Sequence, residues 1–391
     1  MKKKIAILYS GGKHFGGVET YLLQLLSNYN KDEIELHLLS MGRWELTKKL
    51  ENMKITIIKL PSSRLRIKTI FDIKKNLLAG NFDLIVSQGT VANAYARAAS
   101  YLSGVPSLVT VHSDPNFDYH NPLIRGIYAL LDFFTRFQTR KYIAVSKYLT
   151  KILIKEGISR DNIVTIYNGV EFKSRGNDRY FISSNVEISA KEKISPLKRF
   201  GRNDNESEKL RNDKNDVVIG SVGRLHTVKG FHNLIIALSL LKNSDIKLNI
   251  AGSGEQEASL FDLAKRLGVA DRVKLVGYVE DVMTFLGGID IYVQPSLAEG
   301  FGLSVVEAML SGVPTVVTPV GSLPELVKDG ETGIIAASTE PASLAAAIDR
   351  LASDDKLQKS IGMKAQEAVK KSFDYQKWLE ETIKTYKEAA K

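Results

Sequence analysis

The sequence predicts an α/β protein with two Rossmann-like, doubly wound domains. In two parts of the chain, short apolar runs alternate with longer amphipathic stretches, the pattern of parallel sheets wrapped by helices. The length of 391 residues also exceeds the size at which one hydrophobic core usually stops growing. With 44% hydrophobic and 25% charged residues, the composition is that of a folded protein.

The first domain is predicted over residues 1–171. Amphipathic stretches between its apolar runs, such as 18–28 and 122–137, are predicted helices. Its predicted strands are residues 5–9, 34–39, 55–59, 84–87, 108–111, 142–145 and 164–167.

The second domain is predicted over residues 217–372, and a C-terminal helix over 373–391. Between the domains, residues 172–216 are crowded with charged and polar side chains, so we interpret them as a polar linker or insertion. Gly312 and Pro314 mark the end of a helix before one strand. The predicted strands of this domain are residues 217–222, 247–251, 273–276, 291–294, 315–318 and 333–335.

The composition excludes several kinds of site. Cys is absent, which rules out disulfides, thiolate metal ligands and cysteine nucleophiles. The six His are scattered, so no metal site is predicted. No apolar stretch reaches the roughly 20 residues of a spanning helix, and we expect a cytoplasmic protein. The net charge of +10 attracts nucleic acid, anionic lipid or phosphorylated small molecules without choosing among them.

The most informative segment is 299–307, which follows a predicted strand and opens a predicted helix. Glu299 lies in the loop after the strand and Glu307 on the helix, with Gly300 and Gly302 between them. Glycines let backbone N–H groups approach a ligand, and a helix N-terminus suits a phosphate. Carboxylates accept hydrogen bonds from sugar hydroxyls. The segment therefore favours a nucleotide-sugar site over two incidental acidic residues.

A second candidate is the pair of cations Arg224 and Lys229, which follow another predicted strand. Two cations at a strand's carboxyl end can neutralise a departing diphosphate. Solvated surface cations are an equal alternative.

Two candidates lie in the first domain. The Gly-rich turn 10–19 is typical of a phosphate or sugar cradle, but it matches neither the dinucleotide-binding fingerprint nor the P-loop. This weighs against a dehydrogenase or a P-loop NTPase. His112 follows a predicted strand and is expected to face the same cleft, although a satisfied loop histidine or a local pair of His112 with Asp114 is equally open.

Together these motifs resemble the group 1 retaining glycosyltransferases (glycosyltransferase family 4), whose two Rossmann-like domains face each other across a cleft, the GT-B fold. The resemblance covers nearly the whole chain, although 172–216 is longer than the usual connector. It rests on residues 16–19, 110–114, 145–146, 168–170, 223–225 with 229–230, 251–254 and 299–307.

The resemblance implies a role for each candidate. Glu299 would hold the donor sugar, Arg224 and Lys229 would stabilise the departing diphosphate, and His112 would lie close to the donor sugar. Glu307 would bind the ribose of the donor. The residues implied in donor binding are Gly16, Gly17, Gly223, Gly277, Tyr278, Val279, Phe301, Gly302, Leu303, Ser304 and Glu307.

The resemblance also implies the reaction. A hexose-type sugar would pass with retention from a UDP- or GDP-sugar to a glycan or lipid-linked acceptor, in surface polysaccharide or glycolipid biosynthesis. Neither a cofactor nor a metal is expected. The final helix would cross back to the first domain, with Trp378 as a packing anchor.

Residues 121–141 combine large apolar and aromatic side chains with four cations, and Asp132 is their only acidic residue. Residues 64–68 add a second basic patch. A basic amphipathic helix can lie on an anionic membrane, which predicts peripheral contact with the inner face of the cell membrane. A helix that buries its apolar face against the sheet is an equal alternative.

Three other functions stay open. A nucleotide-sugar epimerase or a phosphorylase of the same fold also fits the Gly-rich loops, although the two glutamates favour a transferase. A nucleic-acid-binding protein would need cations interleaved with exposed aromatics, whereas here most cations lie among acidic residues. An inactive, sugar-sensing scaffold is disfavoured because Glu299, Glu307, Arg224 and Lys229 are all present.

Overall fold

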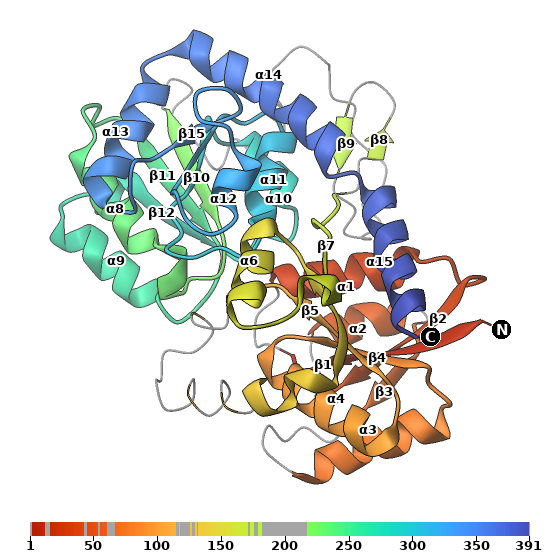
Figure 1. Ribbon diagram of the computed structural model, residues 1–391. Coiled ribbons are helices and arrows are strands. Elements are labelled where there is room, and N and C mark those ends of the chain that lie inside the picture. Colours follow the sequence, from red (N-terminus) through yellow and green to blue (C-terminus); the bar gives the residue numbers. More distant parts are fainter. Residues whose placement is uncertain are drawn as a thin grey trace. The chain divides into compact units, whose positions relative to one another are not determined.

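The computed structural model divides the chain into two compact units. Unit 1 consists of Met1–Gly169 and Gln376–Lys391, and unit 2 of Val170–Tyr375. The structure describes residues 2–390 except 12–15, 43–44, 54, 61–66, 115–116, 118–125, 127–129, 131, 171–172, 176–178 and 182–216. Figure 1 shows unit 1 mainly in red to yellow and unit 2 in green to blue.

Unit 1 contains a seven-stranded sheet in the order β3-β2-β1-β4-β5-β6-β7, with every pair of neighbours parallel. β1 lies inside the sheet, between β2 and β4, and its Ile5, Ile7 and Leu8 side chains are fully buried, as expected for an inner strand of a parallel sheet. The strands are β1 (Lys3–Tyr9), β2 (Ile34–Ser40), β3 (Ile57–Lys59), β4 (Leu84–Gln88), β5 (Ser107–Val111), β6 (Thr139–Ala144) and β7 (Ile163–Thr165).

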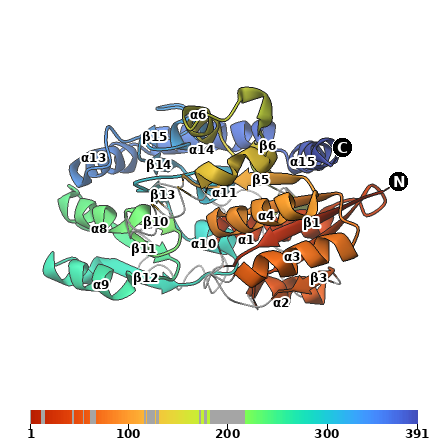
Figure 2. The same cartoon turned by 60° about the horizontal axis from the view of Figure 1, so that its bottom comes forward.

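The strand order fixes which helices share a face of this sheet. From β1 to β3 the chain moves toward one edge, and from β3 to β7 it moves toward the other. Because parallel crossovers are right-handed, α1 (Gly17–Asn28) and α2 (Glu45–Asn52) cover one face. For the same reason α3 (Ile67–Ala79), α4 (Thr90–Ser103) and α6 (Lys147–Lys155) cover the other face. Helices α3 and α4 lie side by side (Figures 1 and 2).

Unit 2 contains a six-stranded parallel sheet in the order β12-β11-β10-β13-β14-β15. The strands are β10 (Val218–Val222), β11 (Lys247–Ala251), β12 (Val273–Gly277), β13 (Ile291–Gln294), β14 (Thr315–Val317) and β15 (Ile334–Ile335). The helices are α8 (Phe231–Leu240), α9 (Glu257–Arg266), α10 (Val282–Gly287), α11 (Leu303–Leu310), α12 (Leu323–Leu326), α13 (Pro341–Ala352) and α14 (Asp355–Ser372). The predicted class, α/β with two Rossmann-like sheets, is confirmed.

Short elements complete both units. The 3₁₀ turns are η2 (Arg136–Gln138), η3 (Arg160–Asn162), η4 (Thr227–Lys229) and η5 (Ala270–Arg272). Within the segment interpreted as a polar linker, β8 (Lys173–Arg175) pairs antiparallel with β9 (Arg179–Phe181), and residues 182–216 lie outside the described part. The strand predicted at 55–59 begins later, at Ile57, because the Ile55 N–H bonds to the Leu50 carbonyl at the end of α2.

The last helix, α15 (Tyr375–Ala389), belongs to unit 1 from Gln376 onward. The Trp378 ring packs edge-on against the Tyr21 ring of α1, with 5.1 Å between ring centroids. At the other end of the helix, Arg140 donates to the Ala389 carbonyl oxygen at 3.0 Å. The C-terminal residues therefore form part of the unit 1 core.

Among the described residues, no helix has both the length and the apolar composition that a membrane span requires.

Candidate functional site

The carboxyl ends of two neighbouring strands of unit 2, β10 and β13, bring Lys229 and Glu299 together. Lys229 lies at the end of η4 after β10, and Glu299 lies in the loop after β13. The Lys229 Nζ atom is 2.7 Å from Glu299 Oε2, although 70 residues separate them in sequence. The structure thus pairs two of the predicted catalytic residues.

Several further contacts fix the Glu299 carboxylate. Its Oε2 atom also accepts from Ser296 Oγ at 3.1 Å and from Gln294 Nε2 at 3.4 Å. The Glu299 backbone carbonyl accepts from the Ser322 N–H at 3.1 Å. Beside it, Gly321 has a φ of +58°, and a Cβ there would lie 2.0 Å from the Glu299 carbonyl oxygen. Only glycine fits that position, so the loop is held by both hydrogen bonds and close packing.

The N-terminus of α11 follows immediately, at Gly302. Gly302 has a φ of +89° and a Cβ there would approach Leu323 to 2.9 Å, which explains the glycine. The first N–H that bonds back into this helix is that of Val305, to the Gly302 carbonyl at 3.0 Å. The N–H groups of Leu303 and Ser304 precede it and therefore lie in the position where helix N-termini bind anions.

Two side chains anchor this helix start. Ser304 donates through its hydroxyl to Gln294 Oε1 at 3.1 Å, and so joins α11 to β13. Phe301 is buried, and its ring packs edge-on against Phe373 with centroids 5.7 Å apart. The predicted donor-binding segment is therefore rigidly connected to the sheet.

Glu307 lies on the first two turns of α11 and is only 8% exposed. Burial raises the pKa of this carboxyl to about 8, because the charged form is poorly solvated there. No ion pair to Glu307 occurs among the residues that the structure describes. Burial raises the pKa of the Tyr292 hydroxyl, and the charges of Glu307 and Glu299 raise it further.

Arg224 lies just after β10 and is exposed. Within the described part of the chain it takes no part in an ion pair. Its loop is held by backbone bonds from the Gly223 N–H to Ala251 and from the Leu225 N–H to Ser253, both 3.0 Å long. A Cβ on Gly252 would lie 1.9 Å from the Gly223 carbonyl oxygen, so the two loops meet backbone to backbone.

Gly277 is the last residue of β12, and Tyr278 and Val279 follow it at the carboxyl end of the strand. Gly277 has a φ of +82°, and its carbonyl accepts from the Gly252 N–H at 2.7 Å. Tyr278 is exposed and Val279 is half-buried. Residues from β10, β12, β13 and α11 are thus gathered at one end of the unit 2 sheet.

In unit 1, the predicted residues Gly16 and Gly17 begin α1. Gly16 donates its N–H to Glu19 Oε2 at 2.9 Å, and the other oxygen of Glu19 accepts from the Tyr9 hydroxyl. The buried Glu19 carboxylate therefore caps the N-terminus of α1. Residues 12–15 of the same Gly-rich turn lie outside the described part.

His112 is half-buried just after β5 in unit 1. Its Nε2 atom lies 2.5 Å from Gln88 Oε1, and Gln88 in turn donates to the Thr110 hydroxyl at 3.3 Å. The Tyr21 ring packs edge-on against the imidazole with centroids 4.8 Å apart. Burial lowers the pKa of His112 to about 4, so the ring is neutral at pH 7 and donates from Nε2 to Gln88.

Four residues that support the site were missed from sequence: Gln88, Tyr21, Gln294 and Ser296. Gln88 and Gln294 are the last residues of β4 and β13, a position that is itself a signal in parallel sheets. Among the described residues, no group of three or more His, Asp or Glu could hold a metal ion.

Two parts of the sequence match models of known glycosyltransferase families. Residues 15–173 match the model described as Glycosyltransferase Family 4, and residues 202–368 match the model described as Glycosyl transferases group 1. The chain belongs to this glycosyltransferase family.

Two curated glycosyltransferases are similar in sequence to this chain. An uncharacterized glycosyltransferase of Methanocaldococcus jannaschii is 31% identical over 267 residues, which cover 67% of this chain and 63% of that protein. The capsular polysaccharide biosynthesis glycosyltransferase CapM of Staphylococcus aureus is 29% identical over 266 residues, 66% of this chain and 64% of that protein. The match thus spans less than two thirds of the length of each relative.

A solved structure shares the fold of this family member. Anabaena HepE in complex with UDP-glucose superposes with a TM-score of 0.79 at 23% sequence identity, and the match covers 98% of both chains.

Proposed function

We propose that this chain transfers a hexose-type sugar from a UDP- or GDP-sugar to a glycan or lipid-linked acceptor, with retention of anomeric configuration. One observation carries the proposal. At the carboxyl ends of β10 and β13, the Lys229 ammonium contacts the Glu299 carboxylate, Arg224 follows the same strand as Lys229, and α11, which carries Glu307, begins at Leu303. Cations and amides suit a diphosphate, and carboxylates suit the hydroxyls of two sugars.

The proposed reaction exchanges one bond at the anomeric carbon of the donor. The acceptor oxygen forms a bond to this carbon while the bond from the carbon to the diphosphate oxygen breaks. The proton of the acceptor hydroxyl passes to the departing phosphate oxygen. Negative charge grows on the diphosphate, and Arg224, Lys229 and the amides of Leu303 and Ser304 stabilise it.

In the protein without ligand, the positive charge of Lys229 is neutralised by its ion pair with Glu299. When the diphosphate arrives, Lys229 gains a second anionic partner, while Ser296 and Gln294 continue to hold Glu299. Glu299 can then accept from a hydroxyl of the donor sugar through Oε1. Glu307 accepts from the ribose hydroxyls, and the neutral imidazole of His112 contacts the donor sugar. In this proposal neither metal nor cofactor takes part.

The relatives support the substrate class. HepE was solved with UDP-glucose, and the name of CapM places that protein in capsular polysaccharide biosynthesis. By analogy, we propose that this chain uses a nucleotide-sugar donor and takes part in surface polysaccharide or glycolipid synthesis.

Thermal unfolding with UDP, GDP, ADP and their sugar conjugates tests the donor. A ligand that binds only the folded state at a hundredfold excess over its Kd adds about 2.7 kcal/mol to the free energy of unfolding. We expect one nucleotide class to raise the Tm, and Glu307→Ala to abolish the rise. If no nucleotide shifts the Tm of the folded protein, the proposal fails.

Product analysis separates the transferase from its alternatives. A transferase forms a new glycosidic bond to an added acceptor, whereas an epimerase converts the donor without an acceptor and a phosphorylase needs inorganic phosphate. Retention is read from the anomeric configuration of the product, which must equal that of the donor sugar.

A further inference from the structure

The net positive charge of the chain belongs to unit 1. Residues 1–169 and 376–391 contain 28 Lys and Arg against 16 Asp and Glu, a net charge of +12. Residues 170–375 contain 26 against 28, a net charge of −2. The positive potential of the protein therefore comes from the unit that does not hold Arg224 and Lys229.

The same unit exposes large apolar side chains on one face of its sheet. Ile67 and Phe71 of α3 are 74% and 54% exposed, and Tyr101 of α4 is 69% exposed. Between β5 and β6, Phe133 and Phe134 are each 61% exposed and Phe137 is 72% exposed. Because the crossovers after β3 are right-handed, all six lie on the face covered by α3 and α4.

The helices on the opposite face of the same sheet do not expose apolar side chains of this kind. Among the described residues of α1 and α2, no large apolar side chain is exposed. Scattered apolar residues are normal on any surface, but a patch confined to one face is not. We call the six residues, Ile67, Phe71, Tyr101, Phe133, Phe134 and Phe137, the aromatic face.

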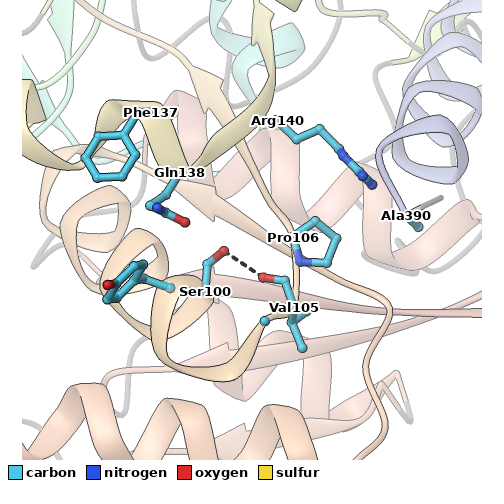
Figure 3. A pocket seen from close by; sticks show the side chains of 9 residues that line it. Ser100, Val105, Pro106, Phe137, Gln138, Arg140 and Ala390 are labelled. Atoms are coloured by element: carbon cyan, nitrogen blue, oxygen red, sulfur yellow. Dashed lines mark hydrogen bonds between the residues drawn. The ribbon is translucent and has the colours of Figure 1, made fainter.

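Contacts show that parts of the aromatic face are continuous. The Phe133 and Phe134 rings are 5.5 Å apart, centroid to centroid. Tyr101 and Phe137 line one hollow of about 540 Å³ together with Arg140, at the amino ends of β5 and β6. Figure 3 shows Phe137 and Arg140 on opposite sides of this hollow, with Pro106 near Arg140.

Exposed cations lie on the helices that cover this face of the sheet. Lys68 and Lys75 are exposed on α3, and Lys151 is exposed on α6. The Arg136 guanidinium lies over the Phe133 ring, 5.2 Å from its centroid. The carboxylate of Asp132, in the same segment, is paired with both Arg97 and Arg136.

We propose that the aromatic face docks onto the surface of an anionic phospholipid bilayer. Aromatic side chains partition into the headgroup layer, and each Lys or Arg near the surface is attracted by anionic lipid. A second copy of the chain does not suit this face, because two units of charge +12 would repel each other. Of the segment 121–141, predicted from sequence to contact the membrane, residues 121–125, 127–129 and 131 lie outside the described part. The face defined here rests on α3 and α4 as well.

Sedimentation with vesicles tests the docking. The full chain is mixed with vesicles of phosphatidylcholine, with and without phosphatidylglycerol, at low and at physiological salt. We expect binding to the anionic vesicles that weakens with salt, and little binding to pure phosphatidylcholine. The triple variant Phe133→Ser, Phe134→Ser, Phe137→Ser should lose at least about tenfold in partitioning. Lys75→Gln should lose about fivefold.

A matched control exists in unit 2. Phe261 on α9 is 43% exposed and has Lys265 4.3 Å above its ring, the same combination of aromatic ring and cation. Phe261→Ser should leave vesicle binding unchanged. Each variant is first shown to have the native Tm and, with soluble substrates, the native activity, which keeps this test separate from that of the proposed function.

Three results would overturn the proposal. The first is that the native chain fails to sediment with anionic vesicles at low salt. The second is that Phe261→Ser weakens binding as much as the triple variant. The third is that the triple variant instead abolishes self-association in light scattering, or binding to duplex DNA, while vesicle binding is unchanged.

Discussion

The ends of the two sheets present their candidate residues in opposite electrostatic states. In unit 2, Lys229 and Glu299 face each other as ions, and Arg224 stands in solvent. In unit 1, His112 is kept neutral by burial and is held by Gln88 and the Tyr21 ring. The candidate residues of unit 2 are therefore fixed charges, whereas the candidate side chain of unit 1 is an uncharged hydrogen-bonding group.

The largest effect should come from the cations of unit 2. Arg224→Ala or Lys229→Ala should slow sugar transfer by about 100-fold or more, because each cation stabilises charge that develops on the diphosphate. The measurement is kcat/KM for transfer, with the exposed Lys356→Ala as a control that should keep native activity. Native activity in both variants would show that neither Arg224 nor Lys229 stabilises the departing diphosphate.

The contrast with unit 1 can be sharpened at Gln88. Gln88→Ala removes the acceptor of the His112 Nε2–H and should lower kcat about tenfold, with little change in the donor KM. Gln88→Glu places a carboxylate there and should raise the pKa of His112 from about 4. If transfer requires the neutral His112 ring, as proposed, activity should be lost at a higher pH on acidification than in the native chain.

The pH profiles of kcat decide this prediction. A merely structural role for Gln88 would lower the Tm of both variants but would leave the acidic limb of the profile where it is. Equal acidic limbs in the native chain and in Gln88→Glu would therefore contradict the assignment of a positioning role.

A smaller effect is expected at Glu307, the buried acid of unit 2. Its pKa is about 8 in the folded protein and near 4.5 when unfolded, so the folded state holds the extra proton between these values. The free energy of unfolding should fall as pH rises through this window. If the donor binds the carboxylate, its affinity should fall about fivefold from pH 8 to pH 7 as the carboxyl takes up its proton.

Calorimetry in buffers of different ionisation enthalpy measures the proton released on binding at pH 7. Glu307→Gln should show no such release and should lack the change in stability with pH. Release of a full proton by Glu307→Gln would point to another group.

Much of the site could be predicted from sequence because its motifs are local. The order strand, loop, helix around 299–307 is written in consecutive residues, and so is the glycine at 302 that the helix start requires. The pairing of Lys229 with Glu299 could not be predicted in this way. It depends on β10 lying next to β13, and hydrophobic periodicity does not specify the order of strands in a sheet.

The sequence by itself determined the α/β class, the two repeating patterns and the residue types at each loop, since these follow from local periodicity and from backbone limits at glycine. Only the tertiary structure decided that Glu307 is buried enough to hold a proton at pH 7 and that Gln88 binds His112. It also brought the Trp378 ring into edge-on contact with the ring of Tyr21, which lies 357 residues earlier in the chain. Burial and long-range contact depend on which surfaces meet after folding, and a linear pattern does not contain that information.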